Sequence, residues 1–591
     1  MPVKDVMKQR GVLVLFLLPV ILLSVGMAHG TVVGLGPNVD IAGESSPDRQ
    51  RVEPTIAVDP RSPSIIVAGA QDLTLKAVGE HRWHGYYRST DNGLTWSSGL
   101  LPGFPGDISP QGLASPLHRS NATSDPVLAF DRNGNLYYAG LALNVTSAGF
   151  VTNTALFVAK FTNDGAIYSG TTLISAGVFP DKPWIAVDTT GGPNDGNVYV
   201  AYDANRTATE FFATLFTRSI DGGMTFSAPF YAPADETGEL PGMAVDTTGN
   251  VYVSDVAFNP VTGAFLGYVE VTKITNGGTS IAGTTRPVNP AFPIPSPLPG
   301  GSFRAFTIPQ MAADQNGVYL VLDDFRTGNA NVLFTRSTNG GATWSFPLTI
   351  NDVVAGQHFF PAIASSGGII SVVWYDSRFS TAPTMTSLDV FYAQSINAGV
   401  SFSSNLRVTS VSFDPNIVRR TDSPGAFQPF IGDYIQVASS PTAVHPVWAD
   451  NRNACDTFDP AFGCVDQDAF TASITVSLTP DFTLTGSPTS LTVPQESSSK
   501  STITLTSQNG FAGTVTLSLS VVPIVNQGPS AILTSTTVIL SAGGSASITL
   551  TVSAKGSTPT GSYTVRIIAS SGALSHTISV PISVVLETHG T

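Results

Sequence analysis

The sequence predicts an all-β protein: a β-propeller built from repeated blades, followed by a β-sandwich. Three observations predict it. Only 12% of the 591 residues are charged, while 56 glycines and 42 prolines supply the turns that many short strands need. A hairpin-like phrase recurs through most of the chain. Beyond it, apolar and polar side chains alternate between turn residues, which is typical of a sandwich.

Residues 1–30 have the order of an export signal. Lys4, Lys8 and Arg10 precede an apolar run from Gly11 to Met27, and small residues follow it. The alternative is an uncleaved membrane anchor, because the run is nearly long enough to span a bilayer. Either interpretation exports the rest of the chain. We therefore expect a secreted, extracellular or cell-surface protein whose only membrane contact is this segment.

The repeated phrase predicts the blades. Each copy combines a short apolar stretch, a turn rich in Asp or Gly, and an alternating strand, which together indicate a β-hairpin. The seven copies begin at Glu53, Asp125, Lys182, Leu240, Ile308, Phe360 and Tyr434, and all but the last have proline in second place. A second hairpin follows most copies, which gives four strands per repeat, as in propeller blades. We expect a propeller over residues 31–478 with seven blades; six blades are the alternative.

The turn of the second hairpin carries another phrase. It reads RSTDNGLTW ending at Trp96, RSIDGGMTF ending at Phe226, RSTNGGATW ending at Trp344 and QSINAGVSF ending at Phe402. These phrases resemble the Asp boxes of the sialidase/BNR-repeat superfamily. In that family the box is a structural turn whose Asp accepts backbone N–H groups and whose Gly has a positive φ. The resemblance implies a structural role for the Asp residues and a glycan or glycoconjugate as partner.

Residues 479–591 are predicted to form the β-sandwich. Their Ser, Thr, Val and Leu alternate in strands with turns about 8–12 residues apart, and they resemble the Ig-like modules of prokaryotic surface and secreted proteins. The chain has two cysteines, Cys455 and Cys464. In an exported protein they predict a local disulfide rather than a metal site, because no His or further Cys stands close by.

The resemblance also selects candidate site residues. In propellers of this family, residues just before each first strand surround the mouth of the central channel. Applied to this chain, that geometry would gather Glu53, Asp125, Lys182, His358, Asp433 and Tyr434. Carboxylates gathered in this way repel one another and need a cation, a shared proton or a ligand. A charged rim without a function, or a structural Ca²⁺ site, is the alternative to a ligand site.

Tyr434 is the candidate nucleophile. The last repeat departs from the others at Gly432-Asp433-Tyr434, and retaining sialidases use a tyrosine nucleophile. The resemblance therefore implies attack by Tyr434, with Glu53 or Asp125 as the base that a tyrosine needs near neutral pH. The alternative is that Tyr434 is an amphipathic plug at the channel axis.

An Asp followed closely by an Arg recurs after the second strand of four repeats. The pairs are Asp203 with Arg206, Asp324 with Arg326, Asp376 with Arg378, and Asp450 with Arg452. Sialidases hold the carboxylate of their substrate with three arginines, so the resemblance implies that these arginines bind substrate, together with Lys182, His358 and Asp433. The alternative is that each Arg forms an ion pair with the Asp beside it in the sequence and acts as a structural brace in its blade.

Two functions are consistent with these observations. The first is a glycan-directed propeller, including a glycoside hydrolase with an incomplete signature, since Arg51-Val52-Glu53-Pro54 stands where the family has Arg-Ile-Pro. It predicts a mouth lined by Tyr434 and by unpaired arginines. The second is a non-catalytic envelope or adhesion protein, which predicts braced arginines and a plugged channel. A net charge of −14 argues against a nucleic-acid partner. We expect no cofactor or metal beyond a structural Ca²⁺.

Overall fold

The computed structural model divides into two compact units, Gly30–Leu478 and a second one that includes Thr479–Thr591. The structure describes residues 30–43, 50–73, 75, 81–147, 149–174, 178–205, 212–233, 237–259, 262–381, 383–419, 428–455, 458–459, 463–478, 480–509, 511–541 and 544–586. The predicted export signal, apart from Gly30, lies outside this range. Within it, no helix is both long and apolar enough to cross a membrane.

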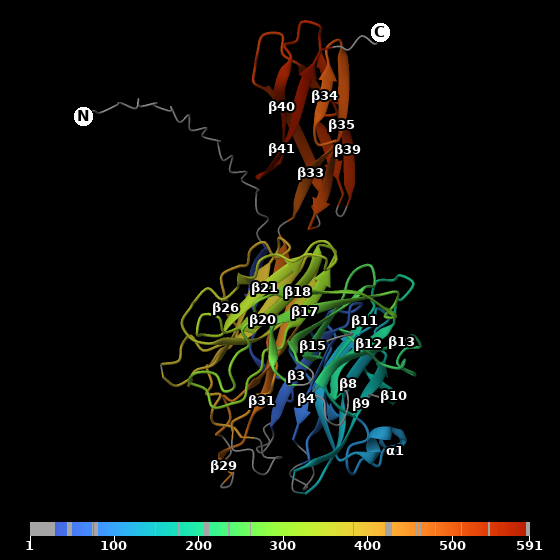
Figure 1. The fold of residues 1–591 in the computed structure, drawn as a ribbon, viewed down its shortest axis with the longest axis vertical. Coiled ribbons are helices and arrows are strands. Elements are labelled where there is room, and N and C mark those ends of the chain that lie inside the picture. Colours follow the sequence, from blue (N-terminus) through green and yellow to red (C-terminus); the bar gives the residue numbers. More distant parts are fainter. Residues whose placement is uncertain are drawn as a thin grey trace, which may run out of the picture. The chain divides into compact units, whose positions relative to one another are not determined.

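Six four-stranded sheets follow one another along the first unit (Figure 1), and each contains four consecutive strands of the chain. Their second strands are apolar and buried on both faces, because a sheet lies on either side of them. The sheets are β3 (Arg51–Val58), β4 (Ile66–Asp72), β5 (Trp83–Ser89), β6 (Ser97–Leu100); β7 (Ala122–Phe130), β8 (Leu136–Val145), β9 (Val151–Thr162), β10 (Ile167–Ile174); β11 (Val178–Val187), β12 (Val198–Asn205), β13 (Phe212–Ser219), β14 (Phe230–Tyr231); β15 (Thr237–Val245), β16 (Val251–Phe258), β17 (Phe265–Thr275), β18 (Ser280–Val288); β19 (Gln310–Asp314), β20 (Gly317–Asp324), β21 (Asn331–Ser337), β22 (Leu348–Thr349); and β23 (His358–Ser366), β24 (Ile369–Asp376), β25 (Asp389–Ser395), β26 (Leu406–Arg407).

A further sheet joins the two ends of this unit. It contains β1 (Gly30–Leu35), β2 (Val39–Asp40), β27 (Gln436–Ser439), β28 (Ala443–Asp450), β31 (Asp468–Thr471) and β32 (Ile474–Leu478). β1 pairs antiparallel with β32, and β2 with β31. The first and last strands of the unit are therefore held in one sheet by backbone hydrogen bonds.

The first strands of the sheets form a closed ring. β3 contacts β7, contacts of the same kind run through β11, β15, β19 and β23 to β27, and β27 contacts β3 again. Apolar side chains fill the space between neighbouring sheets; Leu141 of β8, for example, shares a cluster with Val198 and Val200 of β12. Ring closure and the four-stranded sheets confirm the predicted all-β propeller fold.

The turns between the third and fourth strands have the hydrogen bonds that the repeated phrase predicts. Asp91 accepts from the backbone N of Leu94 (3.1 Å) and Thr95 (2.9 Å), while Ser89 Oγ accepts from Gly93 N, which has a φ of 83°. Asp221 makes the equivalent bonds in the third sheet. In the part of the chain that the structure describes, these two aspartates therefore have a structural role.

In five repeats, the residue before the proline has a left-handed backbone conformation. Glu53, Asp125, Lys182, Leu240 and Phe360 all have φ between 44° and 64°, and a break in the strand register lies at each of them. A left-handed conformation raises the free energy of a bulky residue by about 1–3 kcal/mol. It also turns the side chain out of the alternation of the strand. The bulges of the first three strands present Glu53, Asp125 and Lys182 at one end of the ring.

The second unit is a β-sandwich, as the sequence predicts. One sheet contains β33 (Asp481–Ser487), β35 (Ser497–Gln508), β39 (Ser545–Ala554) and β37 (Ser530–Leu533), and the other contains β34 (Leu491–Pro494), β41 (Leu574–Val585), β40 (Gly561–Ser571), β36 (Gly513–Val522) and β38 (Thr537–Leu540). Alternate residues such as Leu505, Leu550 and Val565 point inward and form its core.

The remaining elements lie in connections of the first unit. They are α1 (Pro110–Ala114), the 3₁₀ helix η2 (Pro116–Arg119), and the short pair β29 (Phe458–Asp459) and β30 (Gly463–Cys464). A disulfide joins Cys455 to Cys464. The predicted local disulfide is therefore confirmed.

Candidate functional site

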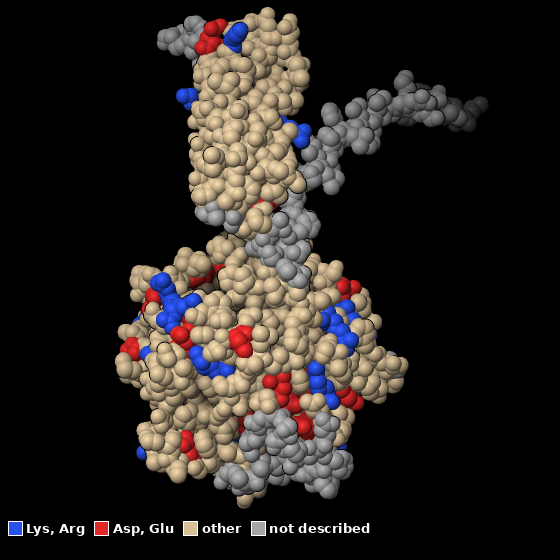
Figure 2. Space-filling model, turned by 180° about the vertical axis from the view of Figure 1, so that it is seen from behind, with Lys and Arg blue, Asp and Glu red and all other residues tan. Residues whose placement is uncertain are grey.

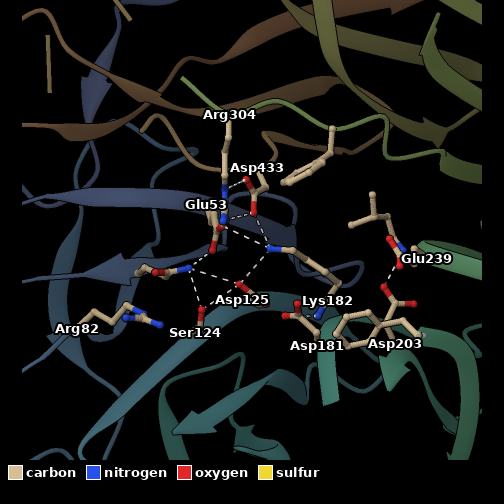
Figure 3. A pocket seen from close by; sticks show the side chains of 14 residues that line it. Glu53, Arg82, Ser124, Asp125, Asp181, Lys182, Asp203, Glu239, Arg304 and Asp433 are labelled. Atoms are coloured by element: carbon tan, nitrogen blue, oxygen red, sulfur yellow. Dashed lines mark hydrogen bonds and ion pairs between the residues drawn. The ribbon is translucent and has the colours of Figure 1, made fainter. Parts of the chain in front are cut away.

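A polar cavity of about 290 Å³ lies where the bulged first strands converge. Figure 3 shows Lys182 reaching into it, with Glu53, Asp433 and Arg304 on one side and Asp203 and Glu239 on the other. Its lining residues come from several sheets and from the connection between β18 and β19; they are Glu53, Gln71, Arg82, Ser124, Asp125, Asp181, Lys182, Asp203, Phe212, Glu239, Leu240, Arg304, Phe306 and Asp433. Four predicted site residues are thus brought together.

Lys182 is the central cation of this cavity. Its Nζ donates to Asp433 Oδ2 at 2.6 Å and lies 3.6 Å from Asp125 Oδ1 and 3.7 Å from Glu53 Oε1. Burial opposes the charge of the lysine, but the carboxylates, Asp125 and Asp433 foremost, raise its pKa well above the ordinary value. Lys182 is therefore an ammonium group that neutralises a carboxylate cluster, and it is not available as a neutral nucleophile.

Asp433 is fixed by two cations. Besides Lys182, it accepts hydrogen bonds from Arg304 Nε at 2.7 Å and from a second nitrogen of the same guanidinium group. Burial acts to raise the pKa of Asp433, but Lys182 and Arg304 outweigh it and the pKa falls below its ordinary value. The preceding Gly432 has a φ of 84° and lies against the backbone of Glu53. The altered last repeat therefore supplies a buried carboxylate whose ionised form is stabilised by two cations.

Glu53 and Asp125 form a proton-sharing pair. Burial raises the pKa of Glu53 well above its usual range and outweighs Lys182. Burial also acts to raise the pKa of Asp125, but Lys182 and hydrogen bonds from neighbouring groups lower it. Gln71 Nε2 links the two carboxyl groups, because it donates to Glu53 Oε2 and to Asp125 Oδ1, the latter at 3.4 Å. The arrangement is consistent with one shared proton carried by Glu53, as expected for adjacent buried carboxyls.

Two acceptor atoms in this cavity have no hydrogen-bond donor. Gln71 Nε2 donates to Glu53 Oε2 and to Ser124 Oγ (3.1 Å). Within the described residues, its own Oε1 has no hydrogen-bond partner, and neither has Glu53 Oε1, which lies within ion-pair distance of Lys182 and Arg304. Gln71 and Glu53 are 1% and 0% exposed. Buried acceptors of this kind require a donor, so they indicate where a ligand's O–H or N–H groups would be bound.

Tyr434 does not line the cavity. Its ring is 5% exposed and packs edge-on against Trp184, and its hydroxyl donates to the backbone oxygen of Pro126 at 3.1 Å. Burial, followed by the charge of Glu53, raises the pKa of Tyr434 well above its ordinary value. These contacts match the interpretation of Tyr434 as an amphipathic plug, and they hold the hydroxyl away from a ligand in the cavity.

The described arginines of the Asp–Arg pairs are held by their own aspartates. Arg326 donates to Asp324 at 2.6 Å, Arg378 to Asp376 at 2.7 Å and Arg452 to Asp450 at 2.7 Å. The guanidinium groups of Arg378 and Arg452 also lie over Phe391 and Phe470. None of the three lines the cavity. They have the geometry of braces; Arg206 lies outside the described residues.

His358 also lies away from the cavity. It is fully buried at the start of β23, and its Nδ1 is 2.8 Å from Asp376 Oδ2, the carboxylate that Arg378 also contacts. It therefore belongs to the brace of the sixth sheet.

Sequence reasoning did not select Arg304, Gln71 or Ser124. Arg304 stands in the connection between β18 and β19, outside the repeated phrase, so no alignment of the repeats could place it. Gln71 and Ser124 adjoin selected positions: Ser124 precedes Asp125, and Gln71 pairs with Val52 across β3 and β4. The position of Gln71 opposite the residue before Glu53 in the predicted hairpin could have indicated that Gln71 lies at the site.

Within the described residues, no group of three or more His, Cys, Asp or Glu side chains has an arrangement that could hold a metal ion. The expectation that the protein needs no cofactor stays a prediction.

Comparisons with known proteins give structural similarity only. No protein-family profile matches the chain, and no curated protein sequence is similar to it. Among solved structures, an ulvan lyase of a new polysaccharide lyase family matches at 12% identity over 75% of this chain and 96% of the other (TM-score 0.41). A protein of unknown function from Dyadobacter fermentans matches at 14% over 60% and 96% (TM-score 0.38), and a leech intramolecular trans-sialidase at 12% over 75% and 70% (TM-score 0.35). At these scores the similarities carry no argument about chemistry.

Proposed function

We propose that the propeller binds a sugar residue of a glycan in the cavity around Lys182. The unpartnered acceptors Glu53 Oε1 and Gln71 Oε1, both buried in the cavity wall, carry this proposal. A sugar offers several O–H donors at short spacing and an apolar ring face. The wall supplies carboxylate and amide acceptors for the donors, and Phe212 and Phe306 for the face. A volume of about 290 Å³ suits one or two sugar rings better than a long chain.

Binding is better supported than hydrolysis. A glycosidase places two carboxyl groups about 5–9.5 Å apart, with the scissile bond between them, whereas Gln71 Nε2 lies between Glu53 and Asp125 and donates to both. The braced arginines and the buried Tyr434 are also what a non-catalytic protein predicts. We propose that this binding takes place outside the cell or at its surface, because residues 1–30 have the pattern of an export signal.

Glycan binding is tested by screening the full chain against immobilised glycans, with two variants. Gln71→Leu removes an acceptor of the cavity and should lower affinity for a bound glycan about tenfold, the effect of one or two hydrogen bonds. Gln310→Leu removes another buried glutamine, at the start of β19 and outside the cavity wall, and should change affinity less than about twofold. Equal effects of the two variants, or no glycan bound by the wild type, would contradict the proposal.

Glycoside hydrolysis is the second candidate, because the pKa values of Glu53 and Asp125 are shifted in opposite directions, as in acid and base pairs. A screen of aryl glycosides tests it by release of the phenol. If there is turnover, Asp125→Asn should abolish it, while Tyr434→Phe should leave it within about twofold, since the tyrosine hydroxyl donates to Pro126. If Tyr434→Phe abolished turnover and Asp125→Asn did not, Tyr434 would be the nucleophile after all.

A further inference from the structure

The cavity is divided electrostatically. On one side Lys182 and Arg304 lie within 4 Å of Asp433 and Glu53. On the other side, Asp203 and Glu239 line the wall. Within the described part of the chain, no Lys, Arg or His forms an ion pair with either of them. Figure 3 shows the two carboxylates next to each other, with Lys182 extending away from them toward Asp433.

Asp203 and Glu239 are held in this position by backbone. Asp203 Oδ2 accepts from Leu240 N at 2.7 Å, and Oδ1 accepts from Thr214 Oγ1 at 3.4 Å. Asp203 is 2% exposed, and burial raises its pKa well above the ordinary value, with Glu239 as the nearest carboxyl that adds to the shift. With no cation beside them, these two carboxyls favour the protonated form, so a ligand cation placed here would be bound by their ionised form.

A third buried carboxyl lies behind this wall. Asp255 of β16 is 0% exposed, and burial, followed by the charge of Glu270, raises its pKa well above the ordinary value. Its carboxyl carbon would lie 2.2 Å from a Cβ placed on Gly238, so the group is directed at the residue before Glu239. Within the described residues, the cavity wall thus has unpartnered buried acceptors at Glu53 Oε1 and Gln71 Oε1, and its three cations, Lys182, Arg304 and Arg82, lie away from Asp203 and Glu239 (Figure 3).

We infer that the Asp203–Glu239 side of the cavity binds a ligand ammonium group, so that the sugar residue recognised is an amino sugar with a free amine. This inference rests on the proposed function and specifies its ligand class. An ammonium group has three N–H donors and no acceptor, which matches a wall made of carboxylate acceptors. A charge-assisted hydrogen bond to a buried carboxylate is roughly twice as strong as a neutral one. The same wall repels the carboxylate of a sialic or uronic acid.

A matched pair of probes tests the inference. Binding of glucosamine oligomers and of the N-acetylated oligomers of the same length is measured by calorimetry with the full chain at about pH 6, where a sugar amine is protonated. The two kinds of oligomer differ at one position of each ring, which has a charged amine in one and an uncharged N-acetyl group in the other. We expect the amine form to bind at least about tenfold more tightly, the effect of one charge-assisted hydrogen bond.

The structure offers a matched control variant. Asp203→Asn should abolish the preference for the amine. Asp323→Asn should retain it, because Asp323 is equally buried and its Oδ2 accepts from Phe360 N at 3.0 Å, as Asp203 accepts from Leu240 N, yet it does not line the cavity. If Asp203→Asn does not fold, Glu239→Gln is the substitute, since Glu239 is partly exposed.

The outcomes separate the two proposals. Equal binding of both oligomers, or a preference for the amine that survives in both Asp203→Asn and Glu239→Gln, overturns the ammonium site and leaves sugar binding intact. Binding of neither oligomer, while other neutral glycans bind, also overturns the ammonium site alone. Absence of binding to any glycan in the screen overturns the proposed function and this inference with it.

Discussion

Lys182 determines the charge balance of the cavity at the scale of single residues. Among the described residues, Lys182 alone lies within 4 Å of carboxylate oxygens of Asp433, Asp125 and Glu53. Arg304 shares Asp433 and approaches Glu53 but is 39% exposed as a side chain, whereas Lys182 is 12% exposed. Removing the lysine would leave carboxylates buried without their nearest cation, which is far more costly than losing a surface ion pair.

We therefore expect Lys182→Met to lower the free energy of unfolding by about 3–5 kcal/mol near pH 7. This loss of stability should be smaller near pH 4, because the carboxylates left without their cation can then bind protons. Lys160→Met is the control: its Nζ donates to Gly222 O and lies over the Tyr137 ring, away from the cavity, and it should cost about 1 kcal/mol. Urea denaturation at both pH values measures this; an equal loss at each pH would show that Lys182 does not neutralise the cluster.

At the scale of elements, Gly432 decides how the last repeat reaches the cavity. Its φ of 84° turns the chain before β27, and a Cβ there would lie 2.7 Å from the backbone N of Glu53. A side chain at this position would therefore push apart β3 and the segment that carries Asp433.

Gly432→Ala should lower the free energy of unfolding by at least about 3 kcal/mol, since both a left-handed alanine and a backbone overlap are introduced. Gly328→Ala isolates the first effect. Gly328 has a φ of 87° but open space around its Cβ position, so the substitution should cost about 1 kcal/mol. Thermal and urea unfolding of the two variants compare them; similar losses would mean that the contact with Glu53 is not tight.

The sequence predicts elements better than side-chain directions. The repeated phrase located the sheets, because hairpin turns and alternation are local properties. The family resemblance, applied to the start of each repeat, also selected Glu53, Asp125, Lys182 and Asp433. It could not tell that Tyr434 would pack under Trp184, since this depends on contacts between distant strands. Nor could it locate Arg304, which lies in a connection without a repeat.

At the scale of the whole molecule, the buried carboxyl groups set the response to pH. Burial raises the pKa values of Asp181, Asp323 and Asp468 to about 7. The visible surface is mostly uncharged, with scattered acidic and basic side chains (Figure 2).

Each of these groups binds a proton more tightly in the folded state than the ordinary value near 3.9 in the unfolded one. Its stabilising contribution is fully present below about pH 4 and is lost as pH rises through 7. We expect the free energy of unfolding to fall between about pH 4 and pH 7, with Asp323 contributing on the order of 3 kcal/mol. Asp323→Asn should flatten this fall in urea denaturation.

Asp221→Asn provides the contrast. Burial acts to raise the pKa of Asp221, but hydrogen bonds from Thr225 and Ser219 outweigh burial and lower the pKa to about 2. Its contribution is therefore present above the unfolded value and lost only in stronger acid. The substitution should leave the slope between pH 4 and pH 7 unchanged, and a steeper or reversed slope in either variant would contradict the assignment.

The pairing of β1 with β32 has a consequence for how the chain is made. A ribosome releases β1 first and β32 only after every other strand of the ring. Until then β1 has no partner, and the sheets of the growing polypeptide expose open edges that can pair with another chain. Closure of the ring therefore waits until β32 has left the ribosome, and a chain truncated before Leu478 would form an open arc of sheets that is prone to aggregation.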